Sequence, residues 1–221
     1  MKPKVVIFGS SGHAKVIADM IESGSSFELI GFIDKFKSVG DEVLGYKVIG
    51  GEQSLANLMV EYGFYQGVVG IGDNFVRSKV VGIIMEQAPN FQFVNCIHKS
   101  ANISNHCQFG SGSIVMPGVT VNVSANVGDH CILNTNSSLD HDCIMKDFSS
   151  LGPNASVGGD TKIGALSHIG ISAAVFQGIL VGENCVIGGG SVVKKNARDN
   201  TVYFGSPAKY ISDRALGDKY L

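Results

Sequence analysis

The chain has 221 residues, of which 44% are hydrophobic and 16% charged, and its formal net charge is -2. This length allows two modest domains, each with its own core. The small net charge and the lack of a basic run argue against a nucleic-acid or anionic-membrane surface. The apolar stretch after Lys4 is too short for a signal peptide, and no run of about 20 apolar residues predicts a membrane span. We therefore expect a cytoplasmic protein.

The first 95 residues predict a small α/β domain. Short apolar runs alternate with segments in which apolar residues recur at helical spacing. This alternation favours a parallel sheet with crossover helices. Strands are predicted at Lys4–Phe8, Phe27–Ile33, Gly67–Ile71 and Phe91–Ile97, and helices at Ala14–Glu22, Gln53–Tyr62 and Phe75–Gln87.

Three polar turns follow strands of this domain, namely Ser11-Gly12-His13, Asp34-Lys35 and Gly72-Asp73-Asn74. Ligands of such sheets bind at the carboxyl ends of the strands. A glycine-rich turn at a helix start can hold phosphate, because N–H groups and the positive end of the helix dipole converge there. Asp34 lies where a dinucleotide fold keeps its ribose-binding acid, although the full Gly-x-Gly-x-x-Gly spacing is missing. The turns indicate nucleotide-phosphate binding; the alternative is glycines that only turn the chain.

Bulky apolar residues recur at every sixth position from Ile97 to Val193, without interruption. A second track, four places after each apolar residue, is made of small residues except at Val119 and Ile179. A period of six fits neither a helix nor an alternating strand, so it predicts a parallel β-helix of hexapeptides. The apolar series is Ile97, Ile103, Phe109, Val115, Val121, Val127, Leu133, Leu139, Met145, Leu151, Val157, Ile163, Ile169, Val175, Val181, Ile187 and Val193.

The place directly after the apolar residue carries Gly in eight repeats and Asn or Asp in three more. These residue types tolerate positive φ, so we expect the sharp corner of each hexapeptide there. Three hexapeptides make one triangular coil, which predicts almost six coils and a prism roughly 27 Å long.

Four cysteines fall in the small inward track, where cysteine packs as a compact hydrophobe. They are Cys107, Cys131, Cys143 and Cys185.

His141 is the candidate general base of the β-helix. It occupies the third place of its hexapeptide, outside the two inward tracks, so it is not a core residue. The flanking Asp140 and Asp142 can hold the imidazole in one tautomer and favour its cationic form, as a general base requires. The alternative is a solvated surface histidine among charges. The histidines do not converge with the spacing of a zinc site, so we expect no metal.

Over its whole length the chain resembles the sugar O- and N-acetyltransferases of the sialic acid and bacillosamine types, a family of hexapeptide acyltransferases. The resemblance rests on short motifs that follow in order around an unbroken hexapeptide array. These motifs are Gly9–Lys15, Phe32–Asp34, Gly70–Asn74, Ile97–Ser104, Leu133–Thr135, Asp140–Cys143 and Gly205–Lys209.

The resemblance implies three parts. Residues 1–95 would form a Rossmann-like α/β domain with a small parallel sheet, and this domain would bind the nucleotide sugar. Residues 96–198 would form a left-handed β-helix, and residues 199–221 would form a C-terminal tail. It also implies a homotrimer with active sites between subunits. Acetyl-CoA would be the co-substrate, and a nucleotide-linked 4-amino-4,6-dideoxy sugar, UDP-linked, would be the acceptor. No metal, nucleic acid or membrane span is expected to take part.

The resemblance also implies site residues. His141 would be the base, and Asp142 would raise its basicity. The residues implied to contact the nucleotide sugar are Ser11, Gly12, His13, Asp34, Lys35, Gly72 and Asn134. The residues implied to contact acetyl-CoA are Ser150, Gly159, Ile171 and Gly189, with Lys194 and Lys195 as candidate phosphate partners.

Two positions depart from the family pattern. Ser150 stands where the bacillosamine-type enzyme has a second histidine nine residues after the base, and a hydroxyl cannot carry positive charge. Asp34-Lys35 replaces a pair of acids, which bears on how the nucleotide is held.

The leading hypothesis for the function of the chain is N-acetylation of a sugar nucleotide. The alternatives are O-acetylation of a sialic-acid-type sugar and a non-catalytic trimeric scaffold.

Overall fold

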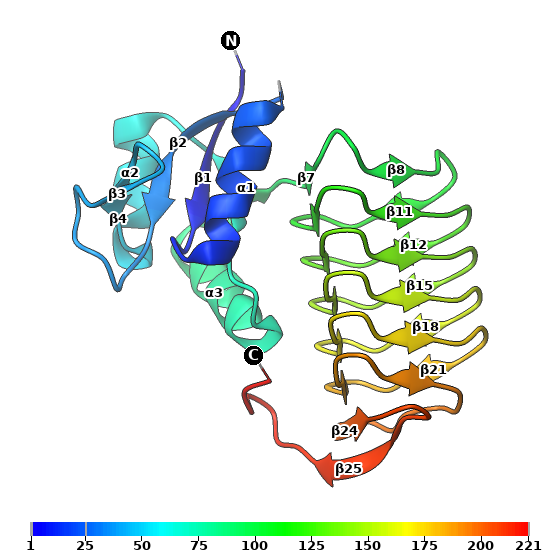
Figure 1. Ribbon diagram of the computed structural model, residues 1–221. Helices are drawn as coiled ribbons and strands as arrows, with labels where there is room; N and C mark the ends of the chain where they lie inside the picture. The colour runs from blue at the N-terminus through cyan, green and yellow to red at the C-terminus, as the bar shows by residue number, and fades with distance from the viewer. Residues whose placement is uncertain (1, 25, 221) are drawn as a thin grey trace. The chain divides into compact units, whose positions relative to one another are not determined.

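The structure, a computed structural model, describes residues 2–24 and 26–220 (Figure 1). Its internal contacts divide it into two compact units. The first comprises the chain up to Gly72 together with Val76–Cys96, and the second comprises Asp73–Phe75 together with the chain from Ile97 onward. Within the described ranges, every helix lacks the length or the apolar character that a membrane crossing requires.

A six-stranded sheet organises the first unit, in the order β3-β4-β2-β1-β5-β6. Neighbouring strands are parallel except β3 and β4, which form an antiparallel hairpin. The predicted alternation of strands and helices is confirmed, whereas the hairpin has no counterpart in the prediction. The elements are β1 (Lys4–Phe8), α1 (Gly12–Ser23), β2 (Glu28–Ile33), β3 (Glu42–Val43), β4 (Tyr46–Gly50), a short 3-10 helix (Glu52–Ser54), α2 (Leu55–Tyr62), β5 (Gln66–Val69), α3 (Asn74–Gln87) and β6 (Gln92–Phe93).

The prediction of one strand over Phe91–Ile97 is wrong. Gln92–Phe93 pairs with β5 in the sheet of the first unit, whereas Cys96–Ile97 is β7, the first strand of a different sheet. The chain leaves one sheet and enters another between these two strands. Apolar residues continue through both, so the apolar pattern alone does not mark the change.

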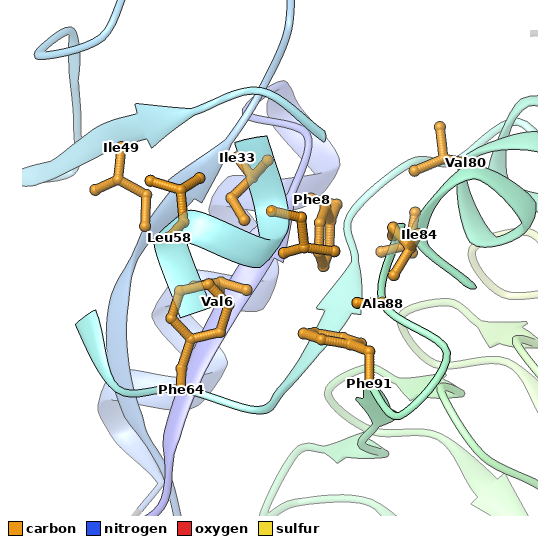
Figure 2. Close-up of a cluster of buried hydrophobic side chains, with 12 residues drawn as sticks. Val6, Phe8, Ile33, Ile49, Leu58, Phe64, Val80, Ile84, Ala88 and Phe91 are labelled. Atoms are coloured by element: carbon orange, nitrogen blue, oxygen red, sulfur yellow. The ribbon is translucent and has the colours of Figure 1, made fainter. Parts of the chain in front are cut away.

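The core of the first unit lies around β1, whose residues Val5–Phe8 are fully buried. A central strand of a parallel sheet is covered on both faces, which explains this continuous apolar run. Figure 2 shows Phe8 close to Phe91, with Ile84 and Ala88 near them. The Phe8 and Phe91 rings meet edge to face, with centroids 5.5 Å apart and an angle of 81° between the planes. This packing fixes the end of β1, from which the first candidate ligand turn departs.

The second unit is a parallel β-helix of three sheets. Seventeen two-residue strands follow one another between Cys96 and Val193, a stretch that is described throughout. From β7 to β20 each pairs with the strand eighteen residues further on, as Ile114 pairs with Ile132. Three hexapeptides therefore make one coil, as predicted.

The three β-helix sheets are named in the order in which the chain visits them. The first contains β7 (Cys96–Ile97), β10 (Ile114–Val115), β13 (Ile132–Leu133), β16 (Ser150–Leu151), β19 (His168–Ile169) and β22 (Val186–Ile187). The second contains β8 (Asn102–Ile103), β11 (Thr120–Val121), β14 (Ser138–Leu139), β17 (Ser156–Val157), β20 (Ala174–Val175) and β23 (Val192–Val193). The third contains β9 (Gln108–Phe109), β12 (Asn126–Val127), β15 (Ile144–Met145), β18 (Lys162–Ile163) and β21 (Leu180–Val181). We call the turns from the first to the second sheet the first corner, and those from the second to the third sheet the second corner.

The two inward tracks fill the prism, as predicted. From Val115 onward every member of the apolar series is at most 3% exposed, and from Ser113 onward every member of the small track is at most 8% exposed. Ile97 is 47% exposed, because a terminal coil has a neighbouring coil on one side only. Burial raises the pKa of Cys185 to about 11, in keeping with a cysteine that packs as a hydrophobe.

The sharp turn of each hexapeptide is not at the predicted place. Positive φ occurs at the fourth place, where even Phe148 (φ 57°) and Leu166 (φ 62°) adopt it. The glycines directly after the apolar residues serve close packing instead: a Cβ on Gly164 would lie 2.5 Å from the backbone nitrogen of Glu183 in the next coil. The positive-φ residues of the coils are Gly112, Gly118, Ser124, His130, Asn136, Asp142, Phe148, Asn154, Asp160, Leu166, Ser172, Gly178, Asn184 and Gly190.

Beyond the coils the chain adds two strands to the first β-helix sheet. β24 (Thr201–Phe204) pairs in parallel with β22, and β25 (Lys209–Asp213) pairs antiparallel with β24. The chain that follows β25 returns to the first sheet, where the ring centroids of Tyr220 and His168 lie 4.7 Å apart.

We predict that Gly164→Ala destabilises the β-helix by about 2–3 kcal/mol, because the added methyl group meets backbone atoms that cannot rotate away. Gly178→Ala is the matched control, since Gly178 has a φ of 70° but open space around its Cβ position. We expect that substitution to cost only about 1 kcal/mol. Urea unfolding followed by circular dichroism measures both. A greater loss in the control than in Gly164→Ala would contradict the packing explanation.

Candidate functional site

The candidate nucleotide turns lie together at one edge of the sheet in the first unit. β1 pairs in parallel with β2 on one side and with β5 on the other, and Phe8 is level with Ile33 and Val69. The carboxyl ends of these three strands therefore meet. The turns that follow them contain the predicted positions Ser11, Gly12, His13, Asp34, Lys35 and Gly72.

The turn between β1 and α1 has the geometry of a site open to a ligand. Ser11 is the N-cap of α1, and its side chain makes no capping hydrogen bond. Gly9 requires glycine because its φ is 91°, but a Cβ on Gly12 would meet nothing within 4 Å. Packing within the chain therefore does not explain the glycine at position 12. Glycine there leaves room for close approach to the start of α1.

Asp34 is tied to its neighbours through both carboxylate oxygens. The Ser10 hydroxyl donates to Oδ2 at 2.5 Å, and the backbone N–H of Phe36 donates to Oδ1 at 2.8 Å. Ser10 is buried, so its hydrogen bond holds the Asp34 carboxylate in place. The neighbouring Lys35 places its ammonium 5.0 Å from the centre of the Phe36 ring. Asp34 is thus a positioned acceptor at the strand edge.

His13 is held in its neutral form. Burial, together with the positive charge of Arg77, lowers the pKa of His13 to about 4. Its Nε2 is buried without a hydrogen-bond partner among the described residues. Arg77 is fully buried, and its Nη1 donates to the carbonyls of Ile71 at 2.9 Å and Gly72 at 3.0 Å. Sequence reasoning did not single out Arg77, which is one of two cations, with Lys79, in the helical segment Phe75–Gln87.

His141 lies at the second corner, in the turn that follows β14. Its Nδ1 is 2.8 Å from Oδ2 of Asp142, and its side chain is 48% exposed. Its backbone N–H donates to Oδ1 of Asp140, which also accepts a hydrogen bond from Nδ2 of Asn122 at 2.7 Å. Because a carboxylate only accepts, Nδ1 carries the proton and Nε2 the lone pair of the neutral ring.

The surroundings of His141 favour its protonated form. The hydrogen bond that the imidazole donates to the Asp142 carboxylate raises the pKa of His141. Desolvation opposes this effect, and the negative charges of Asp140, Asp142 and Asp160 raise the pKa further. The imidazole is therefore a stronger base than an ordinary surface histidine.

Gly159 lies directly under the His141 ring, one coil further on. A Cβ at this position would come within 2.5 Å of both Cε1 and Nε2 of the imidazole. The backbone carbonyl of His141 also accepts the N–H of Asp160 at 2.9 Å. A glycine is thus required for the ring to sit flat against the corner. The structure brings His141, Asp142 and Gly159 together.

Of the other predicted positions of the β-helix, Lys194 and Lys195 follow β23 at the second corner, three coils beyond His141, and the rest lie elsewhere on the prism. Asn134, Ile171 and Gly189 are at the first corner, one face of the triangle away from His141. Asn134 turns its Oδ1 toward the N–H of Thr135 at 2.8 Å. Ile171 is 56% exposed and lies over Gly189, where a Cβ would be 2.8 Å from Cγ2 of Ile171.

Ser150 is on β16 of the first sheet, and the structure does not bring it to His141 within the chain. It is buried, and its hydroxyl lies 2.8 Å from Nδ1 of His168, its partner in the next coil. Sequence reasoning assigned no role to His168. The signal that could have found it is the spacing of eighteen residues from Ser150, one full coil. Among the described residues, no group of three His, Cys, Asp or Glu side chains is placed to hold a metal ion.

Known proteins share this architecture. The family model described as the PglD N-terminal domain matches residues 4–84. The GDP-perosamine N-acetyltransferase of Escherichia coli O157:H7 is 26% identical over 181 residues, which cover 78% of each chain.

Several solved structures match nearly the whole chain, among them two acetyltransferases. One is a histidine-to-alanine variant of GDP-perosamine N-acetyltransferase from Caulobacter crescentus in complex with CoA and GDP-perosamine. Its TM-score is 0.89 at 33% sequence identity, and the match covers 95% of this chain and 97% of that chain. The other is the acetyltransferase domain of PglB from Neisseria gonorrhoeae in complex with acetyl coenzyme A. Its TM-score is 0.88 at 30% identity, with 96% of this chain and 100% of that chain covered.

These likenesses cover both units of the chain at once. They confirm the expected fold class, an α/β domain with a parallel sheet followed by a left-handed β-helix. The chain belongs to the acetyl-CoA-dependent sugar N-acetyltransferases of the hexapeptide acyltransferase family.

Proposed function

We propose that the protein transfers the acetyl group of acetyl-CoA to the amine of a nucleotide-linked 4-amino-4,6-dideoxy sugar, with His141 as general base. The observation that carries the proposal is the half-exposed His141 ring, held by Asp142 at 2.8 Å above the bare backbone of Gly159. The ring is fixed in one tautomer, and the glycine beside it leaves the space that the ring occupies.

The reaction follows from these groups. The neutral amine attacks the thioester carbonyl, and a C–N bond forms as the carbonyl oxygen takes up negative charge. His141 removes a proton from the attacking nitrogen through Nε2, and Asp142 stabilises the resulting imidazolium. The C–S bond then breaks, and the proton passes from His141 to the departing thiolate. Backbone N–H groups are the expected partners of the oxyanion.

The first unit is the proposed holder of the nucleotide. Gly12 at the start of α1 leaves room for a phosphate group, and Asp34 offers a fixed acceptor for a sugar hydroxyl. His13 is neutral near pH 7, so it can donate or accept a hydrogen bond without adding charge. The resemblance points to a UDP-linked acceptor, whereas two relatives carry GDP-perosamine in their names. GDP-linked sugars are therefore the first acceptors to test.

We also propose that the active site forms between two copies of the chain. The predicted positions divide between two corners of one prism, with His141 and Gly159 at the second corner and Asn134, Ile171 and Gly189 at the first. A small thioester cannot touch both corners of one coil across a whole face. It can touch both if the second corner of one copy faces the first corner of another. A closed trimer satisfies this arrangement three times.

The first test follows thiol release from acetyl-CoA with GDP-, UDP- and dTDP-linked 4-amino sugars and with sialic acid. We expect turnover with one of the nucleotide-linked amines, and we expect His141→Ala to lower kcat by roughly 100-fold or more with folding intact. His106→Ala, which removes an exposed histidine elsewhere in the coils, is the matched control. Turnover with sialic acid alone would refute N-acetylation in favour of O-acetylation.

The second test uses pH. Because Asp142 raises the pKa of His141, the rate should rise with pH through a value above the usual 6.5 of histidine. Asp142→Asn removes the charge and the acceptor, so the acidic limb of the kcat profile should move to lower pH and the plateau rate should fall. The acceptor's own ionisation is common to both proteins and cancels in the comparison. An unchanged acidic limb would exclude Asp142 as the partner of the base.

The third test asks whether two copies share a site. His141→Ala keeps the first corner intact, and Ile171→Glu keeps the second corner intact while placing a charge where an exposed apolar side chain stands. Each variant alone should be inactive. Unfolding and refolding the two together should restore part of the activity, because some mixed trimers contain one intact pair of corners. No recovery from a mixture that light scattering shows to be trimeric would contradict the shared site.

A further inference from the structure

Two acids flank His141, and they bond to different parts of it. Oδ2 of Asp142 lies 2.8 Å from Nδ1 of the imidazole. Asp140 instead turns Oδ1 toward the backbone, where it accepts the N–H of His141 at 2.8 Å. Its negative charge still acts on the imidazole. Both acids adjoin the histidine in sequence, and the group that separates their roles lies in the preceding coil.

Asn122 holds Asp140 from that coil. The backbone N–H of Asn122 donates to the carbonyl of Leu139 at 2.9 Å, so Asn122 has the same place in its coil that Asp140 has in the next. Its Nδ2 donates to Oδ1 of Asp140 at 2.7 Å, the oxygen that also accepts the N–H of His141. A hydrogen bond to an ionised carboxylate is stronger than one between neutral groups. Two donors therefore hold one oxygen of this carboxylate.

The turn itself does not need this amide, as the first corner of the same prism shows. Asn134 occupies the place there that Asp140 occupies at the second corner, and its Oδ1 accepts the N–H of Thr135 at 2.8 Å. The corresponding residue of the preceding coil is Met116, whose side chain has no hydrogen to donate. The same local bond thus forms with a neutral side chain and without a donor from the coil before. The acid and the amide at the second corner therefore serve more than the turn.

The amide also keeps Asp140 charged. The hydrogen bond from Asn122 is the largest of the effects that lower the pKa of Asp140, and the bond from the His141 N–H follows it. An ionised carboxylate only accepts hydrogen bonds, so a free one turns toward any donor within reach. Three acids act on the imidazole, namely Asp140, Asp142 and Asp160. Of these, Asp142 forms the bond to the ring.

We infer that Asn122 is a positioning residue of the base. It holds Asp140 on the backbone and thereby reserves the His141 imidazole for Asp142. The inference rests on the proposed function, in which Asp142 aligns the base. The N–H of Asp142 donates to the carbonyl of Val123 at 3.1 Å, so the same preceding coil fixes both acids, one through a side chain and the other through the backbone. Without the amide, Asp140 is free to compete for Nδ1.

Steady-state kinetics give the first readout. Asn122→Ala removes an exposed amide and should lower kcat by about threefold to tenfold, because a ring that pairs with Asp140 turns its Nε2 away from the attacking nitrogen. KM for both substrates should stay within about twofold. Asn126→Ala, which removes an exposed amide on β12 of the same coil, is the matched control and should leave kcat unchanged. An unchanged kcat, or a raised KM in its place, would overturn the positioning role.

NMR titration of the His141 ring, without any substrate, gives the second readout, and the ring signal is assigned by its absence in His141→Ala. Asp142→Asn alone should lower the pKa of His141. Asn122→Ala alone should not lower it, because the ring keeps a carboxylate partner. In the double variant the pKa should lie above that of Asp142→Asn, since Asp140 takes over the ring. Equal pKa values in the double variant and in Asp142→Asn, or a lowered pKa in Asn122→Ala alone, would refute the inference.

The titration also separates this inference from the proposed function. If no acceptor is acetylated, the proposed function fails, and the ring titrations still decide the role of Asn122. If the wild-type chain is active but the double variant titrates like Asp142→Asn, the inference alone is lost. Asn122→Leu, which keeps the size of the side chain but not the donor, should behave as Asn122→Ala does. Unchanged thermal unfolding of the two variants shows that a lower rate is not a folding defect.

Discussion

The structure depends on the contact of each coil with the coil eighteen residues away. Strands stack at a spacing of about 4.8 Å, and the six-residue repeat assigns each place a fixed distance to its copy in the next coil. Bulky and small residues must alternate inside, and where glycine follows the apolar residue a Cβ has almost no room, as at Gly164. The third place lies outside the two inward tracks. That place is where the chain puts His141.

The same stacking prepares the chemistry at the second corner. Asp142 occupies the fourth place, which has a left-handed residue in every hexapeptide from Gly112 to Gly190. Aspartate adopts this conformation more readily than most residues. The turn that the coil needs in any case therefore holds the carboxylate 2.8 Å from the imidazole. One coil further, Gly159 leaves the ring a flat support. The proposed catalytic pair needs no special loop, because the regular repeat positions it.

Periodicity determines how far the sequence predicts this fold. The inward tracks follow from the period of six, and both are buried as expected from Val115 and Ser113 onward. The place of the positive-φ residue in each hexapeptide does not follow from composition, because a glycine can serve either positive φ or the close approach of two backbones. Phe148 and Leu166 show that positive φ in these coils does not need glycine. In the first unit the strands around β1 were predictable from apolar runs. The hairpin β3–β4 was not, since β3 has only two residues.

The site was predictable where it is local in sequence and not where it depends on three-dimensional neighbours. His141 and Asp142 are adjacent, so the pattern of charges around the histidine indicated their pairing. Arg77 acts on His13 from a different element, and His168 meets Ser150 only because one coil has eighteen residues. The division of the β-helix positions between two corners also requires the coil register.

Two histidines of this chain show how environment separates their roles. His13 is enclosed and lies near the Arg77 cation, and both effects lower its pKa, to about 4. His141 is exposed and surrounded by three carboxylates, and its pKa is raised. Near neutral pH the first is a neutral hydrogen-bonding group suited to hold an uncharged part of a substrate, and the second exchanges a proton. Groups of one type whose environments drive their pKa values apart are the usual mark of divided roles in a catalytic site. The buried Arg77 and the exposed acids around His141 therefore account for the two roles that we propose. These roles are substrate binding by His13 at the α/β sheet and proton transfer by His141 at the β-helix.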